Sequence, residues 1–219
     1  MKSEIAQLPL ALPVRAAQGI EDFLVGPSNA EAVAWIDRWP DWPSHGLVLY
    51  GQPGSGKSHL AEVWRAKSGG RMASAERPGP GEGRVVIDNP QLGADETALF
   101  HFLNRLKETG GHVLFVAPGP TAGWPFVLAD LRSRLAALPA VAIAPPDDAL
   151  LEGLLQKFFT DRQIRVGADL LRYLVARMER SYDGARRIVA ALDDAALAQR
   201  RAVTVPLAAQ VLASMDGQR

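Results

Sequence analysis

The chain has 219 residues, of which 47% are apolar and 22% are charged, and its formal net charge is zero. This balance is that of a folded protein with a substantial core, and it excludes wholesale disorder. A neutral chain has no global positive field, so any contact with nucleic acid requires a local basic patch. Because the chain has no cysteine, disulfides, thiolate metal sites and cysteine nucleophiles are excluded.

The N-terminal residues predict neither a membrane span nor a signal peptide. No apolar run approaches the roughly 20 residues that cross a bilayer. Glu4, Pro9 and Pro13 also interrupt the features of a signal peptide. We therefore expect a cytoplasmic protein with no membrane partner. Residues 1–20 lack helical and strand periodicity and predict a flexible tail.

Buried strands and helices alternate through the first two thirds of the chain. Four apolar runs read as strands, at residues 46–50, 84–88, 112–116 and 141–144, with a weaker strand near Met72. Helices are expected at residues 57–66, before Gly69-Gly70, and along the apolar face from Leu99 to Leu106. The alternation predicts an α/β fold with a parallel sheet covered by helices on both faces.

The periodicity is helical from Pro145-Pro146 to the end. Apolar stripes at residues 150–159, 170–178 and 188–197 predict three helices, and Thr204 before Pro206 marks the start of a fourth. We place a boundary near Pro146. An α/β domain at residues 21–146 is followed by a small all-α lid at residues 147–219.

Residues 51–58 match the P-loop pattern G-x-x-x-x-G-K-[ST] and lie between a predicted strand and a predicted helix. Glycines let main-chain N–H groups wrap around phosphates, and the helix adds its positive N-terminal end. Lys57 would neutralise the β- and γ-phosphates, and Ser58 would offer its hydroxyl to Mg²⁺. The expected nucleotide-binding residues here are Gly51, Pro53, Gly54, Ser55, Gly56, Lys57, Ser58 and His59, the last with simple helix packing as the alternative.

Asp88 ends a predicted strand and is the natural further ligand for Mg²⁺, with a structural turn aspartate as the alternative. The next residue is Asn89, where an efficient ATPase of this kind has an acid. Because an amide cannot accept a proton at neutral pH, a base contribution of roughly 10²–10⁴ should be missing. We expect weak or no intrinsic ATPase activity.

Two arginines, Arg132 and Arg134, lie between the last two predicted strands, and one of them could reach a neighbouring subunit's γ-phosphate. A solvated basic helix face explains them equally well. Arg186 begins a lid helix, where spacing alone favours a surface arginine. The tail residues Gln7, Leu8, Leu10 and Leu12 suit a peptide that docks into an apolar groove, although packing on their own domain is the simpler alternative. Trp35, Trp39 and Trp42 predict core packing beneath the first strand.

Together these residues resemble the Hda family of DnaA-related AAA+ proteins over nearly the whole chain. The resemblance rests on residues 23–29, the P-loop, Ile87-Asp88-Asn89, and residues 130–135, 184–188 and 204–206. It implies an AAA+ fold that binds ADP or ATP with Mg²⁺. It also implies that Val25 and Asn29 contact adenine, that Arg134 acts in trans as an arginine finger, and that Arg186 is the lid arginine. Ala117 falls on the polar sensor position, a second departure from an active ATPase.

The same resemblance implies a function and partners. Gln7, Leu8, Leu10 and Leu12 would bind the sliding clamp, and the protein would stimulate hydrolysis of DnaA-bound ATP, a negative control of replication initiation. The few residues after the fourth lid helix leave no room for a helix-turn-helix, so no direct sequence-specific DNA binding is expected. A homodimer is compatible with the sequence. The alternative function is a DNA-dependent ATPase of the helicase-loader type. A small-molecule kinase is disfavoured because the four-helix region does not resemble an acceptor-binding lid.

Overall fold

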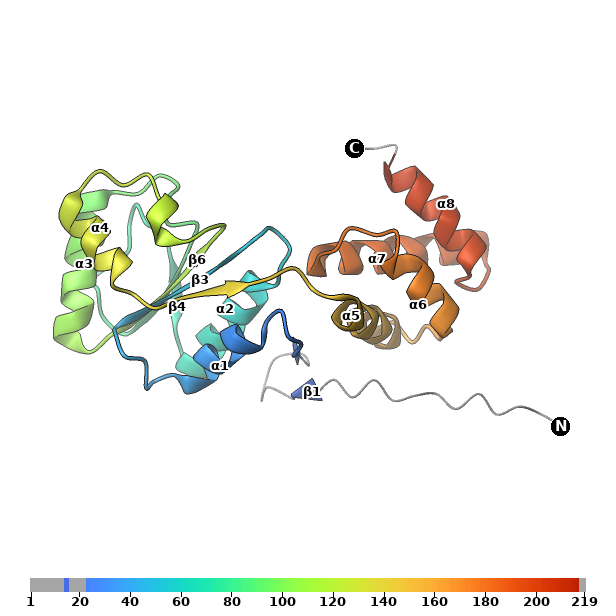
Figure 1. Ribbon diagram of the computed structural model, residues 1–219, viewed down its shortest axis with the longest axis horizontal. Helices are drawn as coiled ribbons and strands as arrows, with labels where there is room; N and C mark the ends of the chain where they lie inside the picture. Colours follow the sequence, from blue (N-terminus) through green and yellow to red (C-terminus); the bar gives the residue numbers. More distant parts are fainter. Residues whose placement is uncertain (1–13, 16–22, 217–219) are drawn as a thin grey trace. The chain divides into compact units, whose positions relative to one another are not determined.

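The computed structural model describes residues 14–15 and 23–216. Contacts divide this part of the chain into two units (Figure 1). An α/β unit comprises residues 27–145, and a helical unit comprises residues 146–216 together with 14–15 and 23–26. Within the described ranges, no helix combines the length and apolarity that a bilayer crossing requires.

The α/β unit is built on a five-stranded sheet in the order β4-β5-β6-β3-β7, and every neighbouring pair is parallel. The strands are β3 (Gly46–Gly51), β4 (Arg71–Ala73), β5 (Arg84–Asp88), β6 (His112–Ala117) and β7 (Ala140–Ile143). Central strands of a parallel sheet are buried on both faces, which explains why they read as continuous apolar runs. The predicted parallel sheet is confirmed.

Helices cover both faces of this sheet, as Figure 1 shows. They are α1 (Ala30–Arg38), α2 (Lys57–Ser68), α3 (Glu96–Thr109), α4 (Ala129–Ala136) and a short 3₁₀ helix, η1 (Thr121–Gly123). Val48, Ile87 and Phe115 pack with α3 and α4, whereas α1 and α2 contact the strands from the other side. Trp42 is 7% exposed and stacks on Trp64 of α2 with ring centroids 5.4 Å apart, so its predicted core packing is confirmed.

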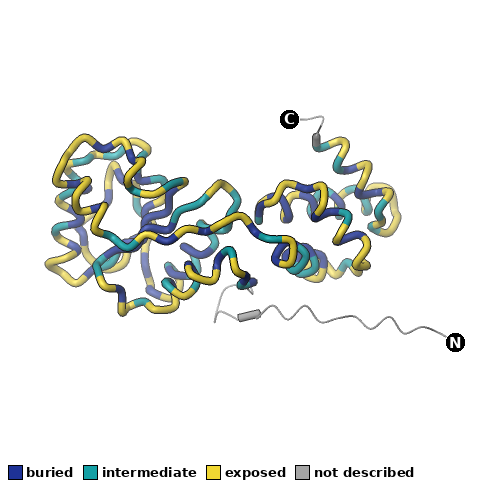
Figure 2. Tube along the Cα trace, viewed as in Figure 1, coloured by how far each residue is buried: buried dark blue, intermediate teal, exposed yellow. Residues whose placement is uncertain are grey.

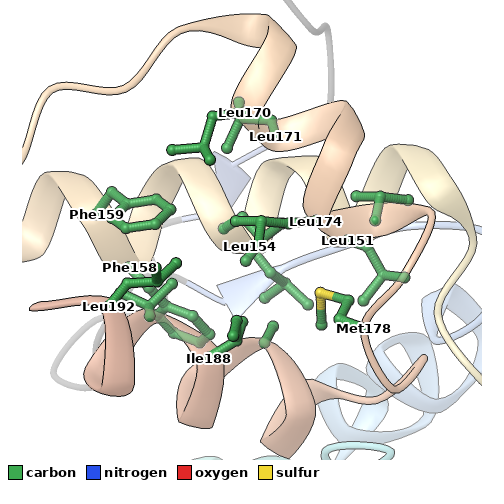
Figure 3. Close-up of a cluster of buried hydrophobic side chains, with 14 of the residues drawn as sticks. Leu151, Leu154, Phe158, Phe159, Leu170, Leu171, Leu174, Met178, Ile188 and Leu192 are labelled. Atoms are coloured by element: carbon green, nitrogen blue, oxygen red, sulfur yellow. The ribbon is translucent and has the colours of Figure 1, made fainter. Parts of the chain in front are cut away.

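Four helices form the helical unit: α5 (Asp148–Asp161), α6 (Ala168–Val175), α7 (Tyr182–Gln199) and α8 (Val205–Asp216). Their apolar stripes meet in one core, where Leu154, Phe159 and Leu174 interdigitate with residues of α7 (Figure 3). Asp147 caps α5 by accepting a hydrogen bond from Leu150 N at 2.8 Å. The predicted all-helical region is therefore confirmed.

Besides η1, two features are additions to the predicted elements. The first is α1, which buries Ala32 and Ile36 and ends before Pro40. The second is an antiparallel ribbon of β1 (Val14–Arg15) and β2 (Phe23–Leu24), in which Leu24 is 7% exposed and belongs to the core of the helical unit. Figure 2 shows that buried residues follow the strands and one side of each helix within each unit.

Candidate nucleotide-binding site

The P-loop begins where β3 meets the end of β7. Gly51 pairs with Ile143, and a Cβ atom built on Gly51 would lie 2.4 Å from the Ile143 carbonyl oxygen. No side chain fits at that distance, so glycine lets the chain turn sharply against the neighbouring strand. The turn is closed by a hydrogen bond from Ser55 N to Gln52 O at 3.3 Å. The strand, loop and helix thus follow one another as the motif requires.

The N-terminal end of α2 is built to receive an anion. Gly56 precedes the helix with φ of 97°, a conformation that favours glycine, and as the N-cap residue it has no side chain that could cap the helix. The first turn, which contains Ser58 and His59, has no acidic residue. Main-chain N–H groups at the positive end of a helix favour phosphate.

The Lys57 ammonium folds back over the loop that precedes it. It donates to Gln52 O at 2.6 Å and lies 3.5 Å from Ser55 Oγ. A cation is therefore held over the turn formed by Pro53, Gly54 and Ser55, beside the first turn of α2. This arrangement fits the phosphates of a nucleotide, because it offers several main-chain donors and one positive charge at a single place.

Asp88 ends β5 and Asn89 follows it, at the same edge of the sheet as the P-loop. Asp88 and Leu49 both pair with Val116, so Asp88 stands two strands away from β3, at about 10 Å for a strand spacing of about 4.8 Å. Asp88 is exposed and accepts a hydrogen bond from Asn89 Nδ2 at 3.2 Å. Ser58 is also exposed. Their oxygen atoms are the type that Mg²⁺ prefers, and the separation suits a carboxylate that acts through water.

Asn89 is held firmly in its position. Its backbone has φ of 47°, a left-handed conformation that asparagine and aspartate tolerate better than most residues. Its N–H donates to Val116 O at 2.8 Å. On the adjacent strand Ala117 is 1% exposed and ends β6 without a polar side chain. Two positions that could assist hydrolysis therefore carry an amide and a methyl group.

The segment expected to hold adenine runs from one unit into the other. Val25 belongs to the helical unit, whereas Asn29 belongs to the α/β unit and precedes α1. Between them, the Ser28 hydroxyl is buried, and it has no hydrogen-bond partner among the described residues. The sequence pattern gave no signal that singled out Ser28.

Arg134 lies on the exposed side of α4, as does Arg132. The Arg134 guanidinium carbon stands 5.0 Å from the centre of the Phe100 ring of α3, a cation–π contact. No ion pair of Arg134 occurs among the residues described, so its charge is offered to solvent. Phe100 was not indicated by the sequence, because it is 34 positions away from Arg134 and the contact arises only when α3 and α4 pack.

Arg186 lies in the first turns of α7 in the helical unit and is exposed. Its neighbour Arg187 forms an ion pair with Glu179 at 2.6 Å, whereas no ion pair of Arg186 is found within the described chain. Ser181 caps this helix through a hydrogen bond from Gly184 N at 2.8 Å. The remaining predicted site residues, Gln7, Leu8, Leu10 and Leu12, lie outside the described residues.

Comparison with known proteins finds a matching lid domain and several solved structures of similar fold. Residues 148–212 match the model of the Hda lid domain. The fold resembles domain III of the replication initiation protein DnaA from Thermotoga maritima, with a TM-score of 0.74 and 17% identity over 88% of this chain and 94% of that one. AMPPCP-bound DnaA from Aquifex aeolicus gives a TM-score of 0.68 and 14% identity over 78% of this chain and 63% of that one.

A motor protein shares the same architecture. The RuvB Holliday junction branch migration motor of Thermotoga maritima gives a TM-score of 0.66 and 14% identity over 87% of this chain and 70% of that one. These identities are low, so the likeness to solved structures establishes the fold, which is that of AAA+ proteins. The match to the Hda lid domain is more specific, because it relates residues 148–212 to one family of AAA+ proteins.

Proposed function

We propose that this chain, which is an Hda-like AAA+ protein related to DnaA, is an adenine-nucleotide-bound adaptor that activates hydrolysis of ATP on DnaA and thereby limits replication initiation. The observation that carries the proposal is a contrast within one site. The phosphate-binding loop is complete, whereas the position beside Asp88 carries the amide of Asn89. Such a site is suited to binding a nucleotide and poorly suited to hydrolysing it.

The nucleotide would be ADP or ATP. Main-chain N–H groups at the start of α2 would bind its phosphates, with Lys57 supplying the positive charge. Asn29 and Val25 would contact the base, and Arg186 would contribute from the lid. Ser58 and Asp88 would hold Mg²⁺, which supplies neutralisation of phosphate charge when it is bound. The AMPPCP carried by the DnaA of Aquifex aeolicus supports an adenine nucleotide as the ligand.

Weak intrinsic hydrolysis follows from the residues around this site. Asn89 cannot remove a proton from an attacking water, and Ala117 offers no polar group to orient one. Either nucleotide would therefore persist on the protein. In this proposal the bound nucleotide has a structural role, and the chemistry takes place on the partner.

Arg134 is the group that would act on the partner's ATP. It is exposed and its charge is held above the Phe100 ring without an ion pair among the described residues. A guanidinium brought to the γ-phosphate of a neighbouring protein stabilises the charge of the transition state, an effect of about 10³–10⁵ in rate.

The test is single-turnover hydrolysis of DnaA-bound ATP with purified protein and clamp-loaded DNA. We expect Arg134→Ala to lower the stimulated rate by about 10³ or more and to leave ADP affinity unchanged. Arg132→Ala is the matched control, since it removes the same charge from another exposed position of the same helix. Unchanged stimulation with Arg134→Ala would remove this mechanism.

The sliding clamp is proposed as the second partner on the sequence of the tail. Gln7 followed by Leu8, Leu10 and Leu12 is suited to bind in an extended conformation to an apolar groove. Deletion of residues 7–12 should abolish retention of the protein on immobilised clamp without altering ADP binding. Retention at the wild-type level would show that another surface binds the clamp.

A further inference from the structure

A cavity of about 420 Å³ lies at the end of the sheet opposite the P-loop. It forms where the chain before β3, the end of α3, the start of β6 and the end of α4 come together. Gly46 begins β3 and Gly51 ends it, so the two sites are separated by about 16 Å at a rise of 3.3 Å per residue. The volume is within the range of about 300–1,000 Å³ that holds small organic ligands.

Part of the cavity lining is apolar and held in place by neighbouring residues. Its wall includes Trp42, Leu103 and Leu106, which are 7%, 9% and 1% exposed. Trp42 donates from Nε1 to Trp35 O at 2.7 Å, so its ring cannot rotate freely. Leu138 packs against Gly46 so closely that a Cβ added there would lie 3.2 Å from its methyl groups. This wall is formed before any ligand arrives.

The lining also carries two cations. Lys107 and Arg134 line the cavity together with the imidazoles of His45 and His112, and no acidic residue of the described chain does so. His45 Nδ1 lies 3.0 Å from Gly111 O. Because a carbonyl only accepts, this ring nitrogen carries a proton. Lys107 is exposed, and no ion pair neutralises it among the described residues. A lining that combines apolar side chains with two cations that have no ion pair among the described residues selects for a ligand with an apolar body and an anionic end.

We propose that this cavity binds a small amphipathic organic anion, with its ring or chain against Trp42 and Leu103 and its anionic group on Lys107 and Arg134. Because the same Arg134 is the proposed arginine finger, a bound anion would neutralise it and suppress activation of the partner. The suppression of activation rests on the proposed function, whereas binding of the anion to the cavity is independent of it.

The binding test uses the full chain saturated with ADP and 1-anilinonaphthalene-8-sulfonate as the probe. Energy transfer from the five tryptophans to the probe reports bound sulfonate, and its loss in variants of the lining residues assigns that binding to the cavity. We expect saturable binding that falls on the order of tenfold or more with Lys107→Gln, since one charge-assisted contact is lost. Ala137→Phe should also weaken binding, because Ala137 is an exposed lining residue whose larger replacement fills the cavity.

Two controls make this outcome decisive. Lys67→Gln removes a lysine charge from α2, away from the cavity, and should bind the probe as wild type does. The uncharged N-phenyl-1-naphthylamine should bind at least tenfold more weakly than the sulfonate. The proposal is overturned if the sulfonate shows no saturable binding, if Lys107→Gln matches wild type, or if Lys67→Gln is equally impaired.

The regulatory part is tested in the DnaA assay. The sulfonate should reduce stimulation by wild-type protein in proportion to occupancy, whereas Lys107→Gln should stimulate normally and resist inhibition. Undiminished stimulation at full occupancy would overturn regulation by this cavity. Absence of stimulation even without the probe would instead overturn the proposed function and leave the measured binding standing.

Discussion

Gly51→Ala tests how the P-loop is attached to the sheet. The added methyl carbon would lie 2.4 Å from Ile143 O, and a tolerable carbon–oxygen contact is about 3.3 Å, so the two strands must separate by about 0.9 Å. The obstructing atom is backbone and cannot swing away, and Gly51 and Ile143 are the last paired residues of β3 and β7. Weakening this pairing should lower the free energy of unfolding by about 1–3 kcal/mol.

Two measurements follow from that displacement. The melting temperature should fall by about 2–12 °C, at roughly 2–4 °C per kcal/mol for a chain of this size. ADP affinity measured by calorimetry should fall on the order of 100-fold, since the loop that holds the phosphates moves by about 1 Å. Gly123→Ala is the control, because a Cβ there meets no atom within 4 Å and the backbone is not left-handed. Wild-type melting and ADP affinity in Gly51→Ala would refute the steric reasoning.

Three further predictions address the helical core, a histidine and the hydrolytic site. Leu174→Ala should lower the free energy of unfolding in urea by about 2–5 kcal/mol, because Leu174 is fully buried, whereas Leu197→Ala, at a site 71% exposed, should change it by less than about 0.5 kcal/mol. Burial, then His45 and then Arg84, hold the pKa of His112 below its ordinary value of about 6.5. The unfolded chain therefore binds more protons below that pH, so stability should fall as the solution is acidified through 6.5, and His112→Gln should flatten this slope. Asn89→Asp should raise intrinsic phosphate release on the order of 100-fold by restoring a base, and an unchanged rate would show that Asn89 is not what limits hydrolysis.

The sequence predicted the features that depend on local pattern. The strand at residues 46–50 is a continuous apolar run, and the P-loop after it follows a fixed spacing, so both could be placed without tertiary information. The boundary of α2 was indicated by Gly69, which caps the helix in a left-handed conformation. In contrast, α1 buries only Ala32 and Ile36, too few positions to establish a helical period.

The features that were not predicted depend on residues far apart in the chain. The contact of Phe100 with Arg134 and the cavity behind it require α3, α4 and the start of β6 to meet. The buried Ser28 hydroxyl is likewise a result of packing. The periodicity of a single segment cannot predict contacts between segments that are far apart in the chain. The placement of Gln7 and Leu8 stays a prediction, as does the action of Arg134 on a partner.

The grouping of residues 23–26 with the helical unit has a practical consequence. Leu24 is part of that core, and a Cβ on Gly26 would already lie 3.3 Å from the Leu150 side chain. The α/β unit is therefore an insertion into the helical unit and not simply a preceding domain. A fragment that begins at Pro146 would lack Leu24, a buried residue of its core, so a study of the lid in isolation should include residues 23–26.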